Sequence, residues 1–147
     1  MAKRDTTKKT FVEDRDSNVF IGLDLPIRKS DGMDGWFAST SDTISAVKNN
    51  IRLLLDTEKG ERLMQPNLGM NLKKYMFEQY NDGTRLSIED DIVSTFKKWL
   101  PFVKIQDIRT RMEAGDMVSG NNTINISIDF NIAKDPTTLE SISVTIR

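Results

Sequence analysis

The segment from Ile124 to Ile132 constrains the fold more than any other part of the sequence. Bulky apolar residues occupy every second position, and Asn, Ser and Asp fill the positions between them. Successive side chains of a β-strand point to opposite faces, so this alternation predicts a strand with one buried face and one face in water. Such a strand belongs in an antiparallel sheet with an apolar layer packed on one side.

The same period of two predicts a strand before this segment and a strand after it. The alternation in Val103–Ile108 shifts by one residue, which indicates a β-bulge or bend. Asp135–Thr138 is rich in turn residues, and a last strand is predicted over Ser141–Arg147. With a polar hairpin loop over Gly115–Asn122, the three strands form an antiparallel meander.

Helices are predicted upstream, where apolar residues recur every three or four positions. The first helix begins at Ser41 or Asp42 and ends near Asp56, and the third begins at Ser87 and ends at Pro101. A short second helix lies between them. The three apolar stripes are Ile44, Val47, Ile51, Leu54 and Leu55, then Leu72, Met76 and Phe77, then Ile88, Ile92, Phe96, Trp99 and Leu100. Three helices followed by a three-stranded antiparallel sheet make an α+β domain.

The chain is expected to have two parts, an extended N-terminal arm over residues 1–40 and the α+β domain over residues 41–147. The first dozen residues of the arm are mostly polar and are predicted to be disordered in the isolated chain. Trp36 and Phe37 are predicted to be buried, because adjacent large aromatic side chains rarely stay in water.

The composition excludes several chemistries. The sequence contains no Cys and no His, which removes disulfides, thiolate nucleophiles, Ser-His catalysis and metals bound by Cys or His. The formal net charge of −1 is too small to attract nucleic acid or a membrane surface electrostatically. No apolar run is long enough to span a bilayer. We therefore expect no cofactor, metal, nucleic acid, membrane or small-molecule substrate.

Two clusters of charge have ordinary explanations. Glu89, Asp90 and Asp91 are consecutive residues that point in different directions on a helix, so they suit the helix dipole better than a metal site. The basic residues of Lys3–Lys9 have no aromatic residues interleaved among them, which makes nucleic-acid binding a weak interpretation.

One motif lies between the first two predicted helices. Residues 57–69 read Thr-Glu-Lys-Gly-Glu-Arg-Leu-Met-Gln-Pro-Asn-Leu-Gly, and Leu72 and Met76-Phe77-Glu78 follow. This order resembles the signature of the baseplate wedge and sheath-initiator proteins of contractile phage tails, which have a counterpart in type VI secretion baseplates. Leu68 stands where that family more often has Phe. The resemblance covers about residues 40–147 and, more loosely, residues 19–40.

The resemblance implies a structural virion protein of the tail baseplate, assembled in the host cytoplasm, and not an enzyme. Its implied partners are the other baseplate wedge proteins and the tail sheath protein. Glu61, Arg62, Pro66 and Gly69 are the positions expected to hold the core bundle of the wedge. The first sheath ring is expected to dock by exchanging extended arms that complete a shared sheet.

The last predicted strand agrees with this expectation. An edge strand has backbone N–H and C=O groups without partners, and a foreign strand satisfies them by β-augmentation. Between Leu139 and Ile146 the sequence has a single charge, at Glu140, and no Pro, Lys or Gly that would protect the edge. The residues expected to receive the sheath arm are Ser141, Ile142, Ser143, Val144, Thr145 and Ile146.

The residues leave alternatives open. The same role fits a type VI secretion system or an extracellular contractile particle, and a generic adaptor domain could use the sheet edge for another partner. Glu61 and Arg62 could form only a surface ion pair. A lysozyme-like hydrolase needs two carboxylates about 5–9.5 Å apart across a cleft. Glu58 and Glu61 are the candidates near a loop, and no apolar pocket is indicated around them.

Overall fold

The computed structural model describes residues 11, 14, 19–30, 36–79, 81–113 and 123–146. The chain divides into two compact units, Met1–Arg52 and Leu53–Arg147. The predictions of a disordered first dozen residues (Phe11 apart) and of a hairpin loop over Gly115–Asn122 concern residues outside this description. The division into an arm over residues 1–40 and a domain over residues 41–147 stays a prediction.

The first unit contains two short strands, β1 (Gly22–Leu23) and β2 (Ser39–Thr40), paired antiparallel. The hairpin continues through a backbone bridge between Lys29 and Phe37. The prediction that Trp36 and Phe37 are buried is wrong, because their exposed fractions are 81% and 54%. Backbone hydrogen bonds across the hairpin hold this segment, so its order does not require the aromatic side chains to be covered.

Helix α1 (Thr43–Asp56) begins and ends where its apolar stripe predicts. The Asp42 carboxylate accepts a hydrogen bond from the backbone N–H of Ser45 at 3.1 Å, as an N-cap does. The stripe residues Val47, Ile51, Leu54 and Leu55 are buried. This helix spans the division between the two units.

The sheet of the second unit contains β3 (Val103–Glu113), β4 (Thr123–Ile132) and β5 (Asp135–Ile146), all antiparallel, with β4 in the centre. The predicted alternation of β4 is confirmed, because Ile124, Ile126, Ile128 and Phe130 are at most 1% exposed. A register shift between Ile105 and Asp107 confirms the bulge in β3.

The connection between β4 and β5 differs from the prediction. The turn consists of Ala133 and Lys134, and the expected turn residues Asp135–Thr138 already belong to β5. The Asp135 carboxylate accepts hydrogen bonds from the hydroxyls of Thr137 and Thr138, both at 2.7 Å. These hydroxyls lower the pKa of Asp135 and satisfy its side chain locally, so turn-forming residues are accommodated at the start of a strand.

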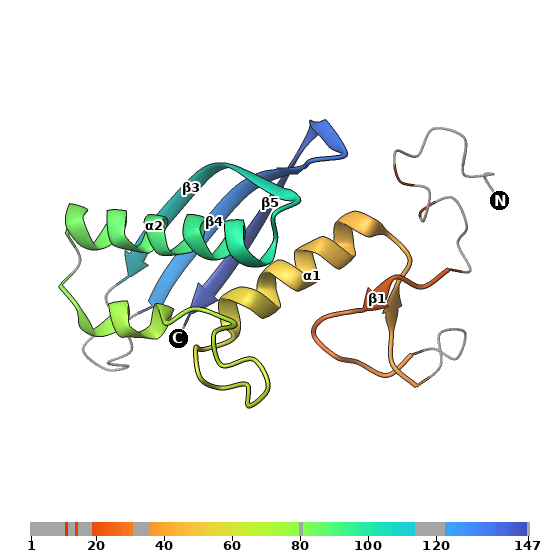
Figure 1. Ribbon diagram of the computed structural model, residues 1–147, viewed down its shortest axis with the longest axis horizontal. Helices are drawn as coiled ribbons and strands as arrows, with labels where there is room; N and C mark the ends of the chain where they lie inside the picture. Colours follow the sequence, from red (N-terminus) through yellow and green to blue (C-terminus); the bar gives the residue numbers. More distant parts are fainter. Residues whose placement is uncertain are drawn as a thin grey trace. The chain divides into compact units, whose positions relative to one another are not determined.

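Helix α2 (Asp82–Trp99) lies across the sheet (Figure 1). Ile88, Ile92 and Phe96 are its most deeply buried apolar side chains, as their spacing predicts. The predicted start at Ser87 is wrong, because Asn81 is the N-cap and the helix begins at Asp82. Asn-Asp-Gly favours turns, but Asn is equally favoured as an N-cap, and the acidic Asp82 then suits the first turn of the helix.

Replacing Asn81 with Ala should lower the free energy of unfolding by about 1 kcal/mol. The Asn81 Oδ1 atom accepts the backbone N–H of Thr84 at 2.8 Å, and Ala removes this acceptor. Urea denaturation followed by circular dichroism measures the change. Ser87→Ala is the matched control, since Ser87 lies inside the helix and its hydroxyl donates to the carbonyl of Gly83 at 3.0 Å. A larger loss for Ser87→Ala than for Asn81→Ala would contradict the observed helix start.

Candidate functional site

The motif residues form a closed loop, Thr57–Met70, which we call the signature loop. It connects α1 to a 3₁₀ helix, η3 (Leu72–Phe77). At its neck, the backbone N–H of Met70 donates to the carbonyl oxygen of Thr57 at 2.8 Å. Gly69 has a φ of +97°, and a Cβ atom at this position would lie 2.1 Å from that same oxygen. The neck therefore requires glycine, both for its backbone conformation and for its lack of a side chain.

A second set of backbone hydrogen bonds closes the loop internally. The N–H of Gly60 donates to the carbonyl of Pro66 at 2.8 Å, and Gly60 has a φ of +93°. Between these two residues, the N–H of Gln65 donates to the carbonyl of Arg62 at 3.1 Å. Pro66 thus contributes its carbonyl to the closure as well as its fixed φ. The loop has a defined shape without any partner.

Glu61 and Arg62 occupy different environments although they are adjacent. The Glu61 carboxylate accepts the backbone N–H of Glu58 at 3.1 Å, so it stabilises the loop from within. Among the described residues, the Arg62 side chain has no hydrogen bond or ion pair, and it is exposed. The possibility of an ion pair between Glu61 and Arg62 is therefore not realised, and the guanidinium is available to a partner.

The remaining carboxylate of the motif is also used structurally. Glu58 forms an ion pair with Lys73 of η3, with 2.8 Å between Oε1 and Nζ. The hydrogen bond that Lys73 donates to the Glu58 carboxylate raises the pKa of Lys73. The backbone N–H of Lys59 donates to the Asn71 side chain at 3.2 Å. These contacts attach the loop to the start of η3.

Three large apolar side chains of the signature loop and η3 are almost fully exposed. Leu63, Met64 and Phe77 have exposed fractions of 98%, 91% and 89%. We call Leu63 and Met64 the loop tip. Sequence reasoning assigned them no role, although an adjacent apolar pair between Gly60 and Pro66, outside any helical period, was a signal. Leu63 and Met64 are adjacent in the sequence, and large exposed apolar groups that lie together are typical of interaction surfaces.

The exposure of Phe77 corrects the predicted second helix. Because η3 is a 3₁₀ helix with three residues per turn, Leu72 and Tyr75 share the buried side, and Phe77 does not. The Tyr75 hydroxyl donates to the Asp91 carboxylate of α2 at 2.8 Å, and burial raises the pKa of this tyrosine. Asp91, one member of the acidic cluster, therefore fixes η3 against α2.

The candidate sheath-binding residues form the second half of β5. Among the described strands, β5 pairs with β4 alone, so one of its edges has no strand beside it. Ile142, Val144 and Ile146 are buried, and Ser141, Ser143 and Thr145 are exposed. The alternation leaves a polar face next to an open edge, which is compatible with the addition of another strand.

The end of β5 lies close to the base of the signature loop. A small cavity of about 230 Å³ is shared by the two regions. Its lining residues are Leu55, Asp56, Glu58, Met70, Leu72, Lys73, Thr145 and Ile146. The fold thus brings the end of β5 beside the base of the signature loop, although the two segments are far apart in the sequence.

The described residues contain no group of three or more Asp and Glu side chains placed to hold a metal ion. Within the same part of the chain, no helix has the length and apolar character needed to cross a membrane. Glu58 and Glu61, the candidate acids for a hydrolase, are engaged by Lys73 and by a backbone N–H of the loop.

The chain resembles two solved structures in its fold. A proposed tail lysozyme from Geobacter sulfurreducens is 20% identical, with a TM-score of 0.58 over 73% of this chain and 92% of that one. A chain of the anti-feeding prophage baseplate is also 20% identical, with a TM-score of 0.55 over 84% of this chain and 81% of that one.

No curated protein matches the sequence. The family model described as baseplate wedge protein gp25 matches residues 41–137, which include α1, the signature loop, α2 and two strands of the sheet. The chain therefore belongs to the gp25 family of baseplate wedge proteins.

Proposed function

We propose that this chain is a structural wedge subunit that joins the core bundle of the wedge to the first ring of the tail sheath and nucleates sheath assembly by β-strand addition. The observation that carries the proposal is the open edge of β5, which pairs with β4 alone among the described strands. In this proposal residues 41–147 form the wedge and sheath-initiator α+β domain and residues 1–40 an extended arm. The particle is a contractile tail, and a secretion system or extracellular contractile particle would use the same surfaces.

The signature loop would bind the wedge proteins. The loop tip supplies apolar surface, and the free Arg62 guanidinium supplies a charge-assisted hydrogen bond. Glu61, Pro66 and Gly69 act indirectly, since their contacts hold the loop in the shape that presents these groups. A carboxylate, or the C-terminal end of a helix, is the kind of acceptor that an arginine placed beside an apolar tip would meet.

The sheath arm would add to β5 along Ser141–Ile146. The main chain of β5 offers hydrogen bonds that any extended segment could use, and the alternating side chains select among such segments. Deleting this strand is a poor test, because Ile142, Val144 and Ile146 are buried and their loss would unfold the sheet. A test must block the edge and keep the core.

Ser143→Lys should reduce sheath nucleation strongly and leave the fold intact. Lysine on an exposed edge opposes the addition of another strand, and the Ser143 side chain is exposed. The assay counts sheath tubes formed by purified sheath subunits on baseplates assembled with each variant, using electron microscopy. Ser127→Lys is the matched control, since Ser127 lies directly opposite Ser143 on the central strand β4. Equal nucleation by Ser143→Lys and native chain would refute strand addition at β5.

A further inference from the structure

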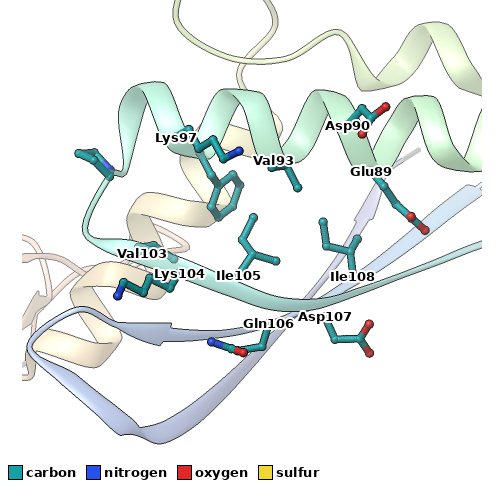
Figure 2. Close-up of a pocket in the computed structure, with 12 residues that line it drawn as sticks. Glu89, Asp90, Val93, Lys97, Val103, Lys104, Ile105, Gln106, Asp107 and Ile108 are labelled. Carbon is teal, nitrogen blue, oxygen red and sulfur yellow. The ribbon is translucent and has the colours of Figure 1, made fainter.

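A groove between α2 and β3 is separate from the two surfaces assigned above (Figure 2). It has a volume of about 670 Å³, within the range of roughly 300–1,000 Å³ that is usual for binding pockets. Val93 of α2 and Ile105 and Ile108 of β3 are half-buried and face the groove (Figure 2). These side chains form an apolar floor that remains partly in water.

The groove runs along a second open edge of the sheet. Among the described strands, β3 pairs with β4 alone, so its outer backbone N–H and C=O groups have no strand beside them. The bulge next to Gln106 is fixed by a hydrogen bond from Gln106 Nε2 to Asn131 Oδ1 at 3.1 Å. A strand added to β3 would place every second side chain over the apolar floor.

The two ends of the groove differ in charge. Lys97 and Lys104 lie at the end near Val103, and neither has an ion pair among the described residues (Figure 2). At the other end the carboxylates of Glu89 and Asp107 are already paired, at 3.7 Å with Arg85 and at 3.0 Å with Arg109. Asp90, which also lines this end, has no ion pair among the described residues. An occupant therefore meets uncompensated positive charge at the lysine end and uncompensated negative charge at the opposite end.

We infer that this groove binds an extended protein segment that adds to β3 as an antiparallel strand. The bound segment has apolar residues at alternate positions and an acidic residue near its C-terminal end. The polarity follows from the direction of β3, which runs from Lys104 towards Asp107, so the C-terminal end of an antiparallel strand lies beside the two lysines. This inference does not depend on the roles proposed for β5 or the signature loop.

The test uses a labelled synthetic peptide, Val-Thr-Val-Thr-Val-Thr-Glu-Thr, and a matched peptide with Lys in place of Glu. Fluorescence anisotropy with the full chain should show that the Glu peptide binds roughly tenfold more tightly. The double variant Lys97→Glu and Lys104→Glu should reverse this preference. Its circular dichroism should match that of the native chain, because both lysines are exposed.

Two further measurements locate the peptide and its hydrogen bonds. N-methylation of alternate peptide residues, made in both phases, should abolish binding in one phase only, because successive N–H groups of a strand point to opposite sides. The Ser143→Lys variant should bind the Glu peptide as the native chain does. An unchanged preference in the double lysine variant would overturn the inference, and so would loss of binding in Ser143→Lys, which would move the peptide to β5.

Discussion

A chain carrying Leu63→Ser and Met64→Ser should keep its free energy of unfolding and lose binding to the wedge proteins by a factor of roughly one hundred or more. Both side chains are more than nine-tenths exposed, so the folded chain loses almost no packing. Burying a Leu or Met side chain at an interface contributes about 1.5–3 kcal/mol. Two such losses together weaken binding by about 3–6 kcal/mol, at about 1.4 kcal/mol for each factor of ten.

Calorimetric titration of the purified variant with the wedge proteins measures this loss, and thermal unfolding verifies the fold. Leu86→Ser is the matched control, since Leu86 is an apolar residue of α2 with 54% exposure and lies outside the signature loop. The control should bind like the native chain. If the double loop variant also binds like the native chain, the loop tip is not the wedge-binding surface.

Gly69→Ala should lower the free energy of unfolding by about 3 kcal/mol or more, a large effect for the addition of one methyl group. Two physical causes combine. The φ of +97° is unfavourable for any residue with a Cβ atom. The new Cβ would also lie 2.1 Å from the Thr57 carbonyl oxygen, which accepts the hydrogen bond from Met70 and cannot move without breaking the neck. Urea denaturation measures the change.

Gly60→Ala separates these two causes. Gly60 has a similar φ of +93°, but nothing lies within 4 Å of the position that its Cβ would occupy. This variant should therefore lose only the backbone contribution, about 1–2 kcal/mol. If the two variants lose the same amount of free energy of unfolding, the close contact between the new Cβ and the Thr57 carbonyl oxygen contributes nothing to the loss.

The sequence predicted those parts of the fold in which burial is periodic. The alternation around Ile128 defined β4, the offset before Ile108 located the bulge, and the stripe through Ile51 located α1. In each case apolar side chains are buried on one face of an element. The spacing of the residues on that face is fixed by the backbone, at about 3.6 residues for a helix and two for a strand.

The errors occurred where local hydrogen bonding decided the structure. The helix predicted to begin at Ser87 begins at Asp82, because the Asn81 side chain accepts a backbone N–H and caps α2. Asp135 begins a strand although its type favours turns, since two threonine hydroxyls satisfy it. Trp36 is exposed because the neighbouring backbone is held by a hairpin that needs no aromatic packing.

The motif identified the position of the candidate site but not its geometry. The family resemblance singled out Glu61 and Arg62 together, and the structure directs Glu61 into the loop and leaves Arg62 outside. The exposure of Leu63 and Met64 depends on the closure between Gly60 and Pro66. That closure depends on the positive φ of Gly60, which cannot be predicted from the periodic spacing of apolar residues.

The signature loop has its folded shape before the subunit meets a partner, because its own backbone hydrogen bonds hold it. Binding therefore requires no ordering of the loop, and the loop is expected to dock as a rigid surface. The subunit therefore displays an exposed apolar tip as soon as it folds. Exposed apolar surface of this kind promotes self-association, so under the proposed function we expect the subunit to aggregate when it is made in excess over the proteins that cover the tip.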